Sequence, residues 1–153
     1  MGNEETFLMK PKVDFCFKEL MEDAEIRRGF ISALLGVEPR EIERTELLPT
    51  FLRKEHSEDK LEIHILELTK LKRREYPETE LLNWARFFNA EKKEEFEMAA
   101  GTSQYIERAY ERLNVLSADE EKRLEYEARE KAIRDHNYLM NYNKENSPRC
   151  RAV

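Results

Sequence analysis

The amino-acid sequence predicts a mainly α-helical fold that keeps one residual β-strand or a minimal hairpin. Apolar residues recur at intervals of three and four over most of the chain, which is typical of amphipathic helices. One run, LEIHILELTKL at residues 61–71, has the alternation and the β-branched content of a strand instead. The 153 residues are 40% hydrophobic and 10% aromatic, enough to bury a core.

Two helices are predicted in the first third of the chain. A short one follows Pro11, and a second begins at Asp23, which suits an N-cap. Gly36 stands where a left-handed residue would end the second helix. The apolar faces of the two helices are formed by Phe15, Phe17, Leu20, Met21, Ile26, Phe30, Ala33 and Leu34.

The strand at 61–71 raises the question of what it pairs with, because the backbone N–H and C=O groups of a strand need partners. Leu61, Ile63 and Ile65 would share one face, and His64, Leu66 and Leu68 the other. Apolar residues on both faces predict a strand buried on both sides. Either residues 42–48 supply a short edge strand, or the rest of the sheet is missing.

The second half of the chain predicts four helices. Pro77 and Thr79 would start the first, Gly101 would end the second, and Thr102 or Ser103 would cap the third. Ser117 and Glu120 fit a capping box for a long, charged last helix. Its sparse apolar stripe consists of Leu124, Ala128, Ala132 and Leu139.

Charge, cysteine content and hydropathy limit the kinds of protein that this sequence can be. The formal net charge is −6, so the bulk charge gives no support for a nucleic-acid-binding module. Cys16 and Cys150 lie far apart and in no metal-ligand spacing, which is typical of reduced thiols. No apolar run approaches 20 residues and the N-terminus lacks a signal peptide, so we expect a cytoplasmic protein without a membrane segment.

Several blocks of the sequence resemble one family. PKVDFCFKELM, FISALLGV, ELLPTFL and EDKL are similar to the opening of the PD-(D/E)XK nuclease family transposases, also called recombination-promoting nucleases. EIHILELTKLK, ELLNWARFFNA and RLEYEAREKAIRDHNYL are similar to later segments of that family. The resemblance implies an α/β restriction-nuclease-like fold. It also implies the activity of a Mg²⁺-dependent DNA endonuclease, which is a hydrolase, with DNA as the partner and a role in DNA recombination.

The resemblance also implies a departure. In the family a nuclease core, with an Asp on one strand and a Glu-x-Gln or Glu-x-Lys element on the next, separates the EDKL-like segment from the IHILEL-like strand. Here the two flanks meet near residues 60–62. We therefore expect a truncated, catalytically inactive member, organised as residues 1–72 (N-terminal helices and residual strand of the nuclease-like domain), 73–142 (helical region) and 143–153 (disordered tail).

Asp14 is the candidate catalytic and metal-ligating residue. It matches an acidic position in the family's first block, so the resemblance implies a contribution to a Mg²⁺ site. The alternative is an acidic residue in the first turn of a helix, with Lys18 one turn later as a partner. Glu58, Asp59 and Lys60 spell Glu-x-Lys, but we interpret them as a polar turn.

The alternative function is a non-catalytic helical interaction module. If the sheet is missing, one aromatic cluster would be partly exposed and would form a binding surface for a partner. The cluster consists of Trp84, Phe87, Phe88 and Phe96. That partner would be a second copy of the chain or an intact family member. A third alternative is a product that folds poorly or is little expressed.

Overall fold

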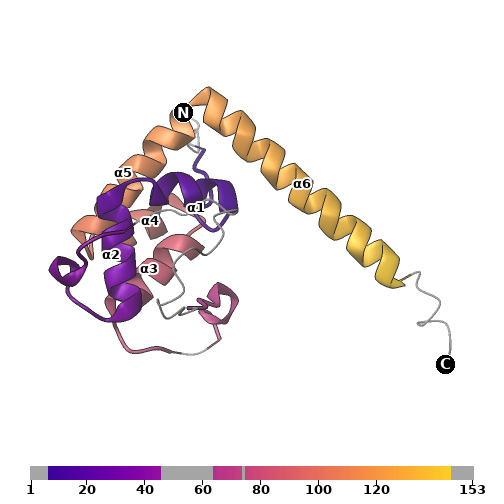
Figure 1. The fold of residues 1–153 in the computed structure, drawn as a ribbon. Helices are drawn as coiled ribbons and strands as arrows, with labels where there is room; N and C mark the ends of the chain where they lie inside the picture. The colour runs from indigo at the N-terminus through magenta and orange to yellow at the C-terminus, as the bar shows by residue number, and fades with distance from the viewer. Residues whose placement is uncertain (1–6, 46–63, 74, 146–153) are drawn as a thin grey trace, which may run out of the picture.

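The computed structural model describes residues 7–45, 64–73 and 75–145 (Figure 1). Within these ranges the fold is mainly α-helical, as the sequence predicts, and contains no strand. The elements are α1 (Asp14–Met21), α2 (Ala24–Leu35), the 3₁₀ helices η1 (Pro39–Glu41) and η2 (Leu68–Lys70), α3 (Glu80–Asn89), α4 (Lys93–Ala100), α5 (Gln104–Ala118) and α6 (Glu120–Glu145).

Helices α1 to α5 form a bundle, and α6 projects from one corner of it (Figure 1). Helix α5 is central, because it packs against α4, α2 and α1 and meets the start of α6. Helix α3 lies against α2 and α4. The N-terminal and C-terminal helices therefore share one core.

Local sequence signals set most helix ends. The Asp23 carboxylate accepts hydrogen bonds from the backbone N–H groups of Glu25 and Ile26, and Gly36 ends the same helix with a φ of 68°. The hydroxyls of Thr79 and Ser103 cap α3 and α5. Each such cap is worth about 1 kcal/mol.

The predicted capping box of the last helix is wrong. Ser117 belongs to the last turn of α5, where its buried hydroxyl accepts a hydrogen bond from the Met9 N–H at 3.0 Å. Asp119 caps α6 in its place, with its carboxylate 3.0 Å from the Lys122 N–H. The Ser117 hydroxyl therefore binds the N-terminal segment and does not cap α6.

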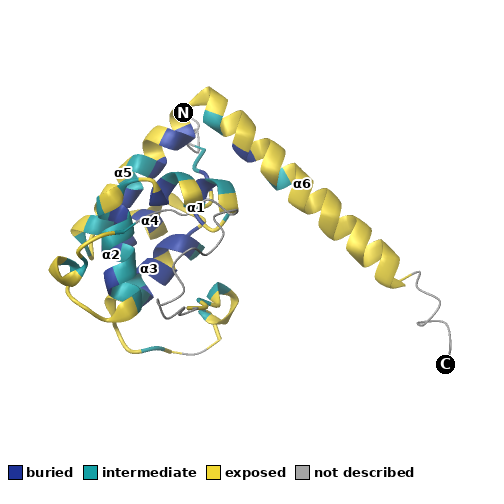
Figure 2. Cartoon of the chain, viewed as in Figure 1, coloured by how far each residue is buried: buried dark blue, intermediate teal, exposed yellow. Residues whose placement is uncertain are grey.

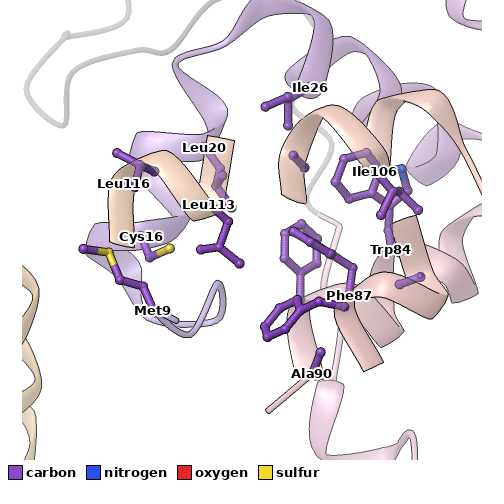
Figure 3. Close-up of a cluster of buried hydrophobic side chains, with 14 of the residues drawn as sticks. Met9, Cys16, Leu20, Ile26, Trp84, Phe87, Ala90, Ile106, Leu113 and Leu116 are labelled. Carbon is purple, nitrogen blue, oxygen red and sulfur yellow. The ribbon is translucent and has the colours of Figure 1, made fainter. Parts of the chain in front are cut away.

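The aromatic cluster is buried, not partly exposed as expected. Trp84, Phe87, Phe88 and Phe96 are each no more than 2% exposed (Figure 3). Phe30 of α2 covers them, with its ring 5.5 Å from Trp84 and 5.1 Å from Phe88, and Phe17 of α1 lies 5.5 Å from Phe88. The N-terminal helices occupy the face that we expected to be open, so this cluster offers no surface to a partner.

The strand predicted at residues 61–71 is also wrong over its described part. Residues 64–67 have no regular secondary structure and residues 68–70 form η2, while residues 61–63 lie outside the described ranges. Only Leu66 and Leu68 pack against the core, and Ile65 is 80% exposed. A strand needs hydrogen-bonding neighbours, and the described part of residues 42–48, Ile42 to Thr45, has no strand either.

Candidate functional site

Asp14 is the first residue of α1 and lies on the surface. Its side chain is 61% exposed, and the carboxylate accepts a hydrogen bond from Lys18 Nζ at 3.0 Å. This is the surface ion pair, one helical turn apart, that the alternative interpretation of Asp14 describes. Among the residues that the structure describes, no three His, Cys, Asp or Glu side chains gather where they could hold a metal ion.

The other polar candidates do not join Asp14. Residues 56 and 58–60, which include the Glu-x-Lys sequence, lie outside the described residues. His64 and His136 are exposed, the first before η2 and the second on the projecting part of α6. Glu67 forms an ion pair with Lys70 at the edge of an apolar hollow of about 370 Å³ between residues 65–71 and α3.

Cys16 is part of the core and not a nucleophile. Its side chain projects from α1, is fully buried and lies beside Met9 of the N-terminal segment (Figure 3). Burial, with a smaller contribution from the nearby Glu19 carboxylate, raises the pKa of the thiol to about 12. The thiolate that nucleophilic or metal chemistry requires is therefore disfavoured.

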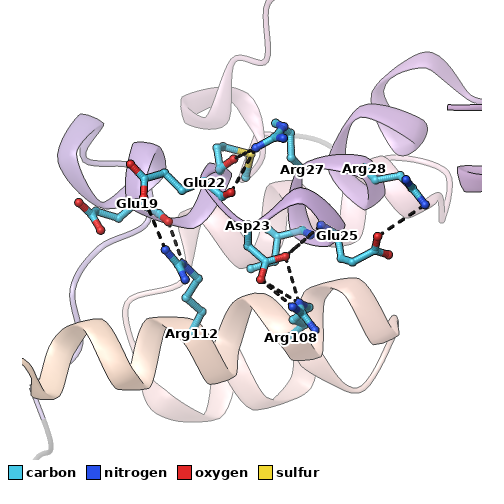
Figure 4. Close-up of polar contacts among 10 residues, drawn as sticks. Glu19, Glu22, Asp23, Glu25, Arg27, Arg28, Arg108 and Arg112 are labelled. Carbon is cyan, nitrogen blue, oxygen red and sulfur yellow. Dashed lines mark hydrogen bonds and ion pairs between the residues drawn. The ribbon is translucent and has the colours of Figure 1, made fainter. Parts of the chain in front are cut away.

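The densest group of charged side chains joins the α1–α2 corner to α5 (Figure 4). Arg108 of α5 donates from Nε and Nη2 to the Asp23 carboxylate at 3.0 and 2.8 Å. This hydrogen bond, together with the backbone N–H groups of Ile26 and Glu25, lowers the pKa of Asp23. The carboxylate thus caps α2 and ties it to α5, which leaves it no free face for a ligand.

Two further arginines reinforce the same corner. Arg112 Nε donates to the Glu19 carbonyl at 2.8 Å. Arg27 Nη1 donates to the Met21 carbonyl at 2.6 Å, and its Nε donates to the Thr45 hydroxyl at 2.9 Å. These arginines bind backbone carbonyls that the ends of α1 leave without helical partners, so their role is structural.

A second polar group fixes the root of α6. Lys122 Nζ lies 2.9 Å from the Glu19 carboxylate, and the buried Tyr126 hydroxyl accepts a hydrogen bond from the Lys10 N–H at 3.1 Å. The Phe7 and Tyr126 rings pack edge-on with their centroids 6.0 Å apart, and the Arg123 guanidinium lies over the Phe7 ring, 4.4 Å from its centroid. All of these partners are separated by about 100 residues, so sequence spacing alone gave no sign of them.

None of the described helices is both long and apolar enough to cross a membrane.

Comparison with known proteins identifies the family. The family model for the PD-(D/E)XK nuclease family transposase matches residues 57–143, more than half of the chain, and this match includes η2, α3, α4, α5 and most of α6. No curated protein and no solved structure matches the chain. On the strength of the family match, this chain belongs to the PD-(D/E)XK nuclease family transposases.

Proposed function

We propose that this chain is a truncated member of its family that has lost the central sheet and does not cleave DNA. The observation that carries the proposal is the position of Asp14. Its carboxylate is exposed and paired with Lys18, and in the described part of the chain it belongs to no group of three His, Cys, Asp or Glu side chains that could hold a metal ion.

Cleavage of a phosphodiester by Mg²⁺ needs several oxygen ligands in near-octahedral geometry, with one or two carboxylates converging on the ion. An exposed carboxylate on a helix surface, with an ammonium group 3.0 Å away and outside any described group of three ligand residues, does not fit that requirement. The described part of the strand predicted at 61–71 is not a strand, so it supplies no scaffold for a second carboxylate. The residues present therefore argue against a Mg²⁺ site at Asp14.

Family membership motivates the rest of the proposal. Intact relatives would be hydrolases that act on DNA in recombination. This chain would be a cytoplasmic protein of the same ancestry that does not catalyse their reaction. The match covers α3, α4, α5 and most of α6, so the family resemblance of this chain lies largely in helical residues.

Incubation of supercoiled plasmid with Mg²⁺ tests the proposal. We expect no nicking by the wild-type chain, by Asp14→Ala or by the matched control Lys18→Ala, while an intact nuclease in the same buffer linearises the plasmid. Mg²⁺-dependent nicking by the wild-type chain would overturn the proposal. Its loss in Asp14→Ala, with retention in Lys18→Ala, would then place the site at Asp14.

A second candidate function is a protein-interaction module. It is favoured by a specific observation, the large apolar side chains exposed along α6. They are Leu124, Ile133, Tyr138, Leu139, Met140 and Tyr142. The partner would be a second copy of the chain or an intact family member.

A further inference from the structure

The distal half of α6, residues 127–145, has almost no contact with the bundle. Every residue in it is exposed except the half-buried Glu130 (Figure 2). Most of the stability of a helix in a protein comes from tertiary packing of an amphipathic face, which this part of α6 lacks. The distal half nevertheless carries Tyr138, Leu139 and Tyr142, which are 71%, 57% and 55% exposed.

A heptad seam runs along the face of α6 opposite Tyr126, from Leu124, which also lines a hollow with Phe7 and Leu8, into the distal part of the helix. The seam positions follow one another at alternating intervals of four and three residues. Tyr126, which faces the bundle, lies two residues beyond the first seam residue and therefore about 200° around the helix from it. The seam consists of Leu124, Ala128, Lys131, Asp135, Tyr138 and Tyr142.

We propose that this seam pairs antiparallel with the same seam of a second copy of the chain, with the two-fold axis at the level of Ile133. Leu124 then lies opposite Tyr142, Ala128 opposite Tyr138, and Lys131 opposite Asp135 of the second copy. A two-fold interface is self-complementary, so each contact occurs twice. This proposal deepens the second candidate function and does not depend on whether the chain cleaves DNA.

The central charges favour the antiparallel orientation, while the next positions of the same repeat, Glu121 and Glu145, place like charges opposite each other in either orientation. Neither Lys131 nor Asp135 forms an ion pair within the described residues. In the antiparallel arrangement the two meet at the centre of the interface and form two ion pairs. In a parallel arrangement each lysine would face a lysine and each aspartate an aspartate, which is unfavourable.

Side-chain size selects the same orientation. The antiparallel pairing sets the small Ala128 against the large Tyr138, so that the ring fills the space that alanine leaves. A parallel pairing would set alanine against alanine and tyrosine against tyrosine. Ala132, on one flank near the centre, allows close approach, and Arg134, on the other flank, is paired with Glu130 of its own helix at 3.8 Å.

Sedimentation equilibrium from about 1 to 500 µM tests the proposal. We expect the average mass to rise from one chain toward two, because interfaces of this limited size give weak, concentration-dependent association. Lys131→Asp or Asp135→Lys alone should weaken association at least tenfold, and the double exchange should restore it. Arg129→Asp, the same type of charge change on the opposite face, is the matched control and should have little effect.

Cysteine cross-linking tests the register. In a Cys150→Ser background, chains carrying Ala128→Cys should form a disulfide with chains carrying Tyr138→Cys, and Ala128→Cys chains alone should not. A strict monomer at all concentrations would overturn the proposal, as would association that is insensitive to both single charge changes. A monomer that instead binds an intact family member through α6 would replace the second copy with that partner. Plasmid nicking by a chain that dimerises as described would overturn only the proposed lack of cleavage.

Discussion

At the residue scale, Gly29 lies at the closest approach between α2 and α5. A Cβ atom built on this buried glycine would lie only 2.3 Å from Cγ of Tyr105. The added atom would also lie 2.4 Å from Cβ of Tyr105, which is bonded to the backbone and cannot move aside without moving α5. Gly29 is therefore required by packing and not by a special backbone angle.

This packing predicts that Gly29→Ala destabilises the fold. Helix propensity alone would favour alanine by about 1 kcal/mol, so a net loss can come only from the overpacked contact. We expect a net loss of about 1–3 kcal/mol in the free energy of unfolding, measured by urea titration with circular dichroism.

Gly101→Ala is the matched control. Its φ is −65°, and the nearest atom to its added Cβ is a carbonyl oxygen at 3.6 Å. This change should be neutral or stabilising by up to about 1 kcal/mol. Equal effects of the two substitutions would contradict the packing argument.

The surroundings of Asp14 could be predicted from the sequence, and those of Trp84 could not. The surface ion pair of Asp14 with Lys18 was predictable as an alternative, because it depends only on a spacing of four residues. Trp84 was expected near an open face, yet it is fully buried, and its indole N–H has no acceptor among the described side chains and backbone. Its burial depends on Phe30, 54 positions earlier in the chain, which no local pattern indicates.

At the element scale, the Asp23 carboxylate serves two helices at once. It caps α2 and binds Arg108 of α5, and these hydrogen bonds lower its pKa from the ordinary value of 3.8. Since the folded-state pKa is below the unfolded one, the ionised carboxylate stabilises the fold above about pH 4. That contribution is lost as the pH falls through the lowered folded-state pKa.

This linkage predicts a pH-dependent effect of Asp23→Asn. Asparagine keeps the cap but not the charge, so the substitution should destabilise most near neutral pH. The difference from wild type should shrink as the pH falls below about 4, measured by urea titrations at several pH values. If Arg108 is the main cause, Asp23→Asn should have a much smaller pH-dependent effect in an Arg108→Gln background. A difference that does not change with pH would contradict the assignment.

Helices were easier to predict than the strand for a physical reason. Helix α2 needs only its own residues for its hydrogen bonds, its cap at Asp23 and its end at Gly36, so its bounds follow from local sequence. Residues 61–71 have the apolar alternation of a strand, but a strand also needs a neighbour. In the described part of this segment Leu66 and Leu68 pack on the helical core instead. The apolar stripe predicted on the last helix, Leu124, Ala128, Ala132 and Leu139, is exposed in the structure, because the bundle covers little of α6 beyond Tyr126.

At the scale of the whole molecule, one buried side chain decides how α6 is joined to the bundle. Tyr126 is 1% exposed, binds the Lys10 N–H through its hydroxyl and contacts the Phe7 ring. Burial raises the pKa of Tyr126 to about 12, so the hydroxyl remains neutral at physiological pH. Beyond this residue α6 makes almost no contact with α1 to α5, so Tyr126 is the last strong attachment of the helix.

Tyr126→Ala should therefore release the root of α6 while the bundle stays folded. The change removes a large buried side chain, which typically costs about 3–5 kcal/mol of contact energy, and local unfolding of α6 becomes correspondingly easier. In limited trypsin digestion at low micromolar concentration, with mass spectrometry of the fragments, cleavage after Lys122 and Arg123 should accelerate at least tenfold. Trp84 fluorescence would verify that the bundle remains folded.

Tyr138→Ala, the same change on the exposed part of the helix, should leave this cleavage rate unaltered. Tyr126→Phe, which keeps the ring, should give an intermediate rate. Equal cleavage rates in wild type and Tyr126→Ala would mean that the ion pair of Lys122 with Glu19, and not the buried ring, holds the helix in place.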